Sequence, residues 1–188
     1  ASASDPDGDD VLIKYTWLIN GVEQPGNTST FNSDLDKYDM ISLMATPFDG
    51  REEGVSSVTS EVIVYNTEPT APEVELTPTF PVEGEDDLLC AIRQRGEDID
   101  PNDLISYNFT WTYLEEGSSW SSTYNGPLSS TYFPGDTVPA AEISAWETWQ
   151  CKATSFDGEE EGGFDVSENV EVQVRCDPTD GPKLYSLG

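Results

Sequence analysis

Apolar and polar residues alternate in short runs along most of this chain, and helical periodicity is almost absent. Clusters of Gly, Pro, Asn and Asp separate runs that are rich in β-branched and aromatic residues, which is typical of strands joined by tight turns. The pattern predicts strands at 14–21, 40–46 and 57–65, and again at 107–112, 148–154 and 169–175. Only Ala140–Trp146 favours a short helical turn.

A repeated phrase divides the chain into two similar parts. Ala45–Gly50 reads Ala-Thr-Pro-Phe-Asp-Gly, and Ala153–Gly158 reads Ala-Thr-Ser-Phe-Asp-Gly. An acidic loop and then a tryptophan stand upstream of each copy: Asp5–Asp10 before Trp17, and Asp98–Asp103 before Trp111. The chain is therefore expected to hold tandem copies of one module.

The two copies differ in how many strands they contain. The second copy has two further predicted strands, at 73–78 and 86–93, which have no counterpart in the first. We therefore expect residues 1–66 to be the C-terminal part of one repeat and residues 73–176 to be a complete repeat, with a semi-stiff Pro-containing linker at 67–72. Residues 177–188 read as a further linker and the first strand of another repeat, at 183–187.

The incomplete first copy needs a partner for its apolar face and open edges. Either a longer parent protein continues upstream, or a neighbouring chain donates strands by strand addition. Neighbouring repeats or copies of the chain itself are thus the expected partners.

The charge of the chain limits its functions. Its 188 residues include 8 Lys plus Arg, 37 Asp plus Glu and no histidine, which gives a net charge of −29. Such a field repels nucleic acid and anionic membranes and attracts divalent cations. The lack of histidine excludes Ser-His-Asp and Cys-His catalysis, and no apolar run approaches the roughly 18 residues of a membrane helix. We expect no enzyme activity, no nucleic-acid partner and no membrane insertion.

The order of Cys90, Trp111 and Cys151 on the second, third and sixth strands of the complete copy resembles that of immunoglobulin-type sandwiches. The resemblance implies an all-β fold of tandem immunoglobulin-like β-sandwiches, with a Cys90–Cys151 disulfide across the two sheets. The alternative is that all three cysteines are reduced and buried. Cys176 is left without an assigned partner.

The acidic loops are candidates for calcium binding, because calcium takes about six to eight oxygen ligands. In an immunoglobulin-like sandwich the loop after strand two and the turn after strand six lie at the same end, so each acidic loop should meet a Phe-Asp-Gly turn. The second copy is expected to be the weaker site, because Asn102 replaces an acid and the glycine is missing. The alternative is that these loops are simply favourable turn sequences. The candidate ligands are Asp5, Asp7, Asp9, Asp10 and Asp49 in the first copy, and Asp98, Asp100, Asn102, Asp103 and Asp157 in the second.

Several features together resemble the PKD-type, cadherin-like and other immunoglobulin-like repeats of large bacterial and archaeal surface proteins. They are Asp5–Asp10, Tyr15–Trp17, Asn20-Gly21, Thr46–Gly50 and Val62–Asn66, with their partners in the second copy. The resemblance implies an extracellular or cell-surface, calcium-binding, structural or adhesive module within a rod or fibre. Asn27 and Asn108 lie in glycosylation acceptor triplets, which are compatible with secretion.

A carbohydrate-binding accessory module of a secreted protein is the alternative function. Aromatic residues gather around an insertion in the second copy and could stack on surface glycans, although they could equally cover an enlarged core or a subunit contact. They are Trp120, Tyr124, Tyr132, Phe133, Trp146 and Trp149.

Overall fold

The computed structural model describes residues 1–176 and divides the chain into two compact units after Thr67. Within these residues both units are built from antiparallel strands, and the only helical element is a short 3-10 turn, η1, at Ala140–Glu142. The predicted all-β fold and the helical turn within 140–146 are confirmed. The strand predicted at 183–187 lies outside the described residues.

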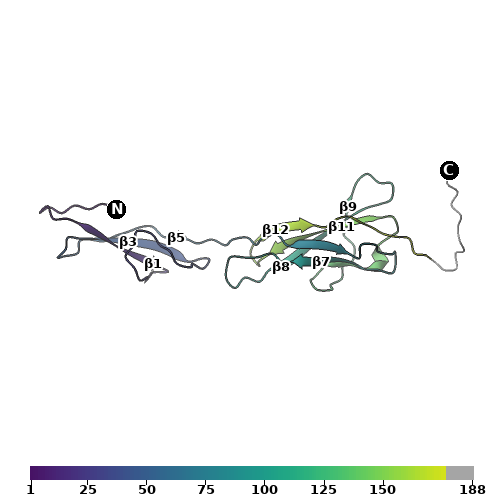
Figure 1. Ribbon diagram of the computed structural model, residues 1–188, viewed down its shortest axis with the longest axis horizontal. Helices are drawn as coiled ribbons and strands as arrows, with labels where there is room; N and C mark the ends of the chain where they lie inside the picture. Colours follow the sequence, from purple (N-terminus) through teal and green to yellow (C-terminus); the bar gives the residue numbers. More distant parts are fainter. Residues whose placement is uncertain (177–188) are drawn as a thin grey trace. The chain divides into compact units, whose positions relative to one another are not determined.

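The second unit is a β-sandwich of two sheets (Figure 1). The larger sheet has the order β12-β11-β8-β9, with β13 also paired to β11; its strands are β8 (Ser106–Leu114), β9 (Ser122–Thr123), β11 (Thr148–Phe156), β12 (Glu161–Val166) and β13 (Val170–Glu171). The smaller sheet has the order β10-β7-β6; its strands are β6 (Glu73–Thr77), β7 (Leu88–Gln94) and β10 (Thr137–Val138).

The core of the second unit lies between these sheets. Trp111, Trp149 and Cys151 point inward from the larger sheet, because alternate residues of a strand share one face. Leu76, Leu88 and Cys90 meet them from the smaller sheet. Each of these six side chains is 3% exposed or less, so the two sheets exclude water from one another.

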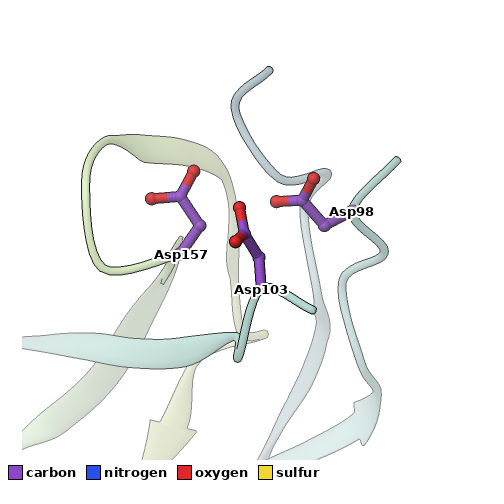
Figure 2. A group of neighbouring side chains, drawn as sticks. All are labelled: Asp98, Asp103 and Asp157. Atoms are coloured by element: carbon purple, nitrogen blue, oxygen red, sulfur yellow. The ribbon is translucent and has the colours of Figure 1, made fainter. Parts of the chain in front are cut away.

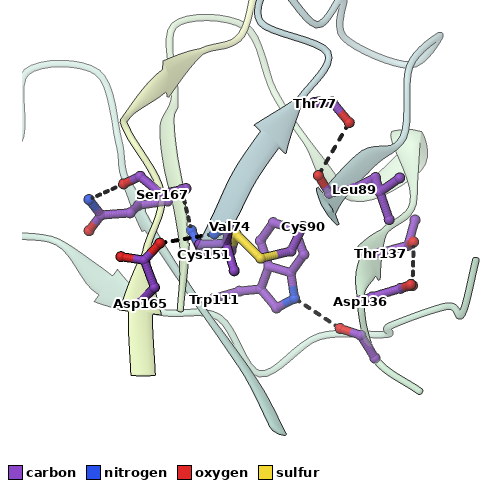
Figure 3. Close-up of a disulfide and its surroundings, with 12 residues drawn as sticks. Val74, Thr77, Leu89, Cys90, Trp111, Asp136, Thr137, Cys151, Asp165 and Ser167 are labelled. Atoms are coloured by element: carbon purple, nitrogen blue, oxygen red, sulfur yellow. Dashed lines mark hydrogen bonds between the residues drawn. A yellow bond between two sulfur atoms is a disulfide. The ribbon is translucent and has the colours of Figure 1, made fainter. Parts of the chain in front are cut away.

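A disulfide between Cys90 and Cys151 joins the two sheets, as the sequence predicts (Figure 3). Cys90 belongs to β7 and Cys151 to β11. The Trp111 indole lies beside the bridge and donates its N–H to the Gly135 carbonyl at 3.0 Å. The buried indole therefore has its one polar group satisfied.

The first unit contains a single sheet within its described residues. The order is β2-β1-β3-β4, with β5 also paired to β3; the strands are β1 (Leu12–Ile19), β2 (Val22–Glu23), β3 (Met40–Phe48), β4 (Ser57–Val58) and β5 (Val62–Ile63). A tight turn joins β1 to β2 at the end of the predicted strand 14–21, with φ of 52° at Asn20 and 77° at Gly21. Two successive positive φ values match the two-residue hairpin turn that Asn-Gly favours.

The long strand pairs of the two units have the same register. Trp17 pairs with Leu43 in the first unit, and Trp111 pairs with Cys151 in the second. Every buried hydrophobic residue of the described chain nevertheless belongs to the second unit. The first unit has the sheet but not the second layer that would bury its face.

Two predicted strands are shorter than expected. The run 57–65 is divided into β4 and β5, because the Thr59 hydroxyl accepts the Leu43 N–H at 3.0 Å where a backbone carbonyl would continue the ladder. The run 169–175 forms a strand only at β13, because the Gln173 N–H turns away to donate to the Pro81 carbonyl at 2.7 Å.

The linker predicted at 67–72 is also corrected. The second unit begins at Glu68, and Pro69 and Pro72 are both buried. The Gly163 N–H donates to the Pro69 carbonyl at 2.8 Å. Most of the predicted linker is therefore an integral part of the second unit.

A buried carboxylate, that of Asp136, orders the loop between β9 and β10 of the second unit. Asp136 is fully buried and accepts hydrogen bonds from the N–H groups of Thr131, Tyr132 and Phe133, and from the Thr137 hydroxyl. Burial by itself would raise the pKa of Asp136, but these donors hold the pKa below its ordinary value of 3.8. One ionised side chain thus fixes the loop between β9 and β10.

Replacing both bridged cysteines, Cys90→Ala with Cys151→Ala, should destabilise the second unit by about 4 kcal/mol, because the bridge closes a long loop in the unfolded chain. The two residues are 61 positions apart. Denaturant unfolding followed by near-UV circular dichroism measures the change. Cys176→Ala is the matched control, since Cys176 is a free and exposed cysteine. Equal midpoints for the double variant and the control would contradict the prediction.

Asp136→Asn should lower stability at neutral pH by at least about 2 kcal/mol, because the amide cannot accept all of these hydrogen bonds. The folded-state pKa is lowered, so the contribution of Asp136 is present above pH 3.8 and is lost as pH falls through the folded-state pKa. The difference between wild type and variant should therefore shrink in acid. A difference that stays constant between pH 7 and about 3 would show that the charge is not responsible.

Candidate functional site

Three carboxylates from two loops meet at one end of the second unit. Asp98 and Asp103 stand in the loop between β7 and β8, and Asp157 begins the turn between β11 and β12. Oxygens of the three side chains lie within 4.8 Å of one another (Figure 2). Among residues 1–176 this is the one such group of three acidic, histidine or cysteine side chains.

Each loop orients its aspartates through hydrogen bonds to its own backbone. Oδ1 of Asp98 accepts the Asp100 N–H at 2.8 Å, which is a local Asx turn. Oδ1 of Asp157 accepts the N–H groups of Glu159 and Glu160, both at 2.7 Å. In both aspartates one carboxylate oxygen thus holds the loop.

The three carboxylates of this acidic cluster, Asp98, Asp103 and Asp157, repel one another when they are ionised. Asp157 is only 7% exposed, so its charge is poorly screened by water. Two like charges at such a separation repel by roughly 3 kcal/mol at an effective dielectric constant of about 20. A cation between the carboxylates would reverse the sign of this term.

Unsatisfied oxygens are concentrated around the same cluster. Within the described chain, three buried side-chain oxygens have no hydrogen-bond partner: Oδ2 of Asp98, the Tyr107 hydroxyl and the Ser155 hydroxyl. Tyr107 and Ser155 are directly paired across β8 and β11. Burial, the largest effect, raises the pKa of Tyr107 above its ordinary value. A buried oxygen without a partner costs about 1–3 kcal/mol, so this end of the unit favours a ligand or ordered water.

The donor set suits a hard cation. The cluster offers carboxylate oxygens only, with no nitrogen or sulfur, and calcium and magnesium prefer such oxygens. Asp98, Asp103 and Asp157 would be the side chains that hold the ion.

The start of the second unit is fastened to the loop that carries Asp98. The Thr70 N–H donates to the Glu97 carbonyl at 2.8 Å, and the Glu97 N–H donates to the Thr70 hydroxyl at 2.7 Å. A side chain at Gly162 would overlap the Pro69 carbonyl oxygen. Residues 68–71 are therefore held by the loop that carries Asp98 and Asp103 and by β12, the strand that follows the Asp157 turn.

The predicted ligands of the second copy are only partly brought together. Asp98 and Asp157 meet as expected, and Asp103 completes the group. Asp100 is 8% exposed but lies outside the group, and Asn102 adopts a positive φ of 77° in the turn. Three of the five candidate ligands of the second copy, Asp98, Asp103 and Asp157, are therefore brought together.

The first unit does not form the equivalent cluster. Asp5 and Asp49 line one hollow of about 350 Å³, while Asp7, Asp9 and Asp10 are exposed. The local turns are the same as in the second unit, since Oδ1 of Asp5 accepts the Asp7 N–H and Oδ1 of Asp49 accepts two backbone amides. The amides of Glu52 and Arg51 lower the pKa of Asp49.

The expectation that the second copy is the weaker site is therefore not supported by the geometry. In the second unit β7 and Thr70 hold the acidic loop from its N-terminal side, whereas residues 1–10 form no strand.

The aromatic residues considered for sugar stacking do not form one surface set. Trp149 is 1% exposed, and the Tyr124 and Tyr113 rings pack on it at 5.1 and 5.0 Å between ring centroids. Phe133 packs on Tyr107 at 5.0 Å. The exposed members of the set are Trp120, Tyr132 and Trp146.

The two asparagines in acceptor triplets are both exposed. Oδ1 of Asn27 accepts the Tyr15 N–H at 2.6 Å, and Nδ2 of Asn108 donates to Glu161 at 2.8 Å.

The chain matches no protein-family model and no curated protein. Within the described residues no helix is long and apolar enough to span a membrane.

Gly162→Ala should destabilise the second unit by more than about 2 kcal/mol, because the new methyl group has to displace the Pro69 backbone. Gly158→Ala is the matched control: Gly158 has open space around it and a φ of 102°, so the change costs only about 1–2 kcal/mol of backbone strain. Chemical denaturation of both variants measures the difference. A smaller loss for Gly162→Ala than for Gly158→Ala would contradict the tight packing of residues 68–71.

Proposed function

We propose that this chain is a non-catalytic, calcium-stabilised structural or adhesive module of a larger extracellular surface protein, rod or fibre. One observation carries the proposal: the carboxylates of Asp98, Asp103 and Asp157 converge where a buried oxygen of Asp98 has no hydrogen-bond partner.

Calcium is the cation that this chemistry favours. It tolerates irregular oxygen shells and accepts backbone carbonyls beside carboxylates, whereas magnesium demands a near-ideal octahedron. The net charge of −29 raises the local concentration of divalent cations around the chain. When bound, the ion would supply positive charge to the three carboxylates.

Calcium binding would also have a mechanical effect, because residues 68–71 are hydrogen-bonded to the loop that carries Asp98. A cation that orders Asp98 also orders Glu97, and Glu97 is doubly hydrogen-bonded to Thr70. Calcium binding would therefore strengthen the attachment of the segment that enters the second unit. This supports a load-bearing role in preference to a signalling one.

An extracellular setting is supported by the Cys90–Cys151 disulfide, because such bonds persist in oxidising compartments. A non-catalytic role is supported by the lack of histidine in the chain. Sugar binding has weaker support, since half of the candidate aromatic residues already serve ring contacts within the unit.

Calcium should raise the melting temperature of the full chain relative to chelator. A ligand at a hundredfold excess over its Kd stabilises the native state by about 2.7 kcal/mol. Asp98→Asn and Asp103→Asn should each remove most of this gain, because the amide keeps the size of the side chain but loses the charge. Thermal melts with calcium and with chelator, together with calorimetric titration, measure the effect.

Glu168→Gln is the control for this experiment. It also removes one carboxylate charge, but Glu168 is exposed between β12 and β13 and is not a member of the acidic cluster. The proposal fails if melts with calcium and chelator superimpose, or if Glu168→Gln reduces the calcium effect as much as Asp98→Asn does.

A further inference from the structure

Two hydroxyl groups next to the acidic cluster are buried without a hydrogen-bond partner. Ser155 is fully buried and Tyr107 is 5% exposed. Their hydroxyl oxygens and Oδ2 of Asp98 are the three buried side-chain oxygens of the described chain that lack such a partner. Ser155 comes two residues before Asp157, and Tyr107 comes four residues after Asp103. The unsatisfied oxygens therefore belong to the same two segments of chain as the three carboxylates.

The two hydroxyl groups lie on the same side of one sheet. Tyr107 of β8 and Ser155 of β11 are direct partners, so their side chains share a face, and their burial shows that it is the inward face. A Cβ atom at Gly96 would lie 2.6 Å from Oγ of Ser155. The Ser155 hydroxyl therefore faces the loop that carries Asp98 two residues later.

Backbone groups, and not apolar side chains, approach Ser155. The pairing of β11 with β12 shifts register at this point, so Gly162 and Gly163 stand opposite Ser155. Such irregularities are common beside binding sites. The Thr70 carbonyl oxygen would also contact a Cβ atom at Gly96, so this carbonyl and the Ser155 hydroxyl approach the same point. Polar groups of several segments thus converge behind the acidic cluster.

A cation at the acidic cluster needs more oxygens than the carboxylates readily supply. Calcium takes about six to eight oxygen ligands and often completes its shell with water. Oδ1 of Asp98 and Oδ1 of Asp157 already accept backbone N–H groups. A buried water makes about three hydrogen bonds, and a hydroxyl group can donate or accept one of them. The hydroxyls of Tyr107 and Ser155 have the right chemistry to hold such a water.

We propose that the hydroxyl groups of Tyr107 and Ser155 together hold one ordered water that completes the oxygen shell of the cation bound by the acidic cluster. Both are positioning residues, because they touch the water and not the ion, and they set the affinity of the site. The inference rests on the proposed calcium function. It goes beyond that function by assigning the affinity in part to two uncharged residues outside the acidic cluster.

Calorimetric titration of the full chain with calcium tests the proposal in Tyr107→Phe and Ser155→Ala. Each variant should bind calcium about 10- to 100-fold more weakly than the wild type, as is typical when an outer-shell partner of a metal is removed. In chelator each variant should melt at or above the temperature of the wild type, because the substitution removes a buried oxygen that has no partner. A purely structural role for the hydroxyls cannot produce this combination.

Two hydroxyls elsewhere in the second unit provide matched controls. Tyr113→Phe removes a hydroxyl from the same face of β8, since Tyr113 is an even number of residues from Tyr107. Ser167→Ala removes a buried hydroxyl that accepts the Cys151 N–H at 3.1 Å. Both controls should keep the calcium affinity of the wild type, and Ser167→Ala should lower the melting temperature equally in calcium and in chelator.

The double variant Tyr107→Phe/Ser155→Ala shows whether the two hydroxyls act on one water. If they do, the double variant should bind calcium hardly more weakly than either single variant, because the first substitution already releases the water. Additive losses of affinity would overturn the shared water.

The proposal is also wrong if the single variants bind calcium like the wild type, or if they lose the same stability in calcium and in chelator. A wild type that binds no calcium contradicts the proposed function itself. Failure of the calcium site is thereby distinguished from failure of the two hydroxyls to support it.

Discussion

The second unit depends on the contact between two sheets at Trp111. Its indole fills the space between β7 and β11, beside the disulfide, and its N–H is satisfied by Gly135. A single antiparallel sheet cannot keep one face dry, so the covering layer decides whether alternating apolar residues become a core. The two units show this with nearly the same strand pair. The pair is covered in one unit, where the inward residues are buried, and uncovered in the other, where they are not.

The same two-layer arrangement explains why the acidic cluster forms in only one unit. Asp98 follows β7 and Asp157 follows β11, so the carboxylates are held by strands of both sheets. Asp98 and Asp157 each use one carboxylate oxygen to hold their own turn. In the first unit both turns form with the same local hydrogen bonds, but Asp5 and Asp49 belong to no such cluster. Local turn chemistry is therefore not sufficient to form the cluster.

Much of this fold could be predicted from the sequence, because the deciding signals are local. Period-two alternation predicts β1, β3, β8 and β11, Asn20-Gly21 predicts the hairpin, and the order of Cys90, Trp111 and Cys151 indicates the bridge.

The structural features that the sequence did not predict depend on contacts between residues that are far apart in the chain. The burial of Pro69 requires Gly162, which is 93 positions later in the chain, as 162 − 69 = 93. The break between β4 and β5 depends on a hydroxyl that replaces a carbonyl. That Asp103 belongs to the acidic cluster and Asp100 does not could not be decided from the sequence, because both are aspartates of the same loop.

The strong negative charge and the open sheet are two constraints with opposite effects on assembly. A net charge of −29 makes copies of the chain repel one another, while an uncovered apolar face favours association. Repulsion between exposed charges is screened within about 10 Å at ordinary salt, whereas burial of an apolar face is not weakened by salt. Divalent cations reduce the charge further when they bind between carboxylates. Ionic conditions that lower the net charge therefore weaken the repulsion between copies of the chain.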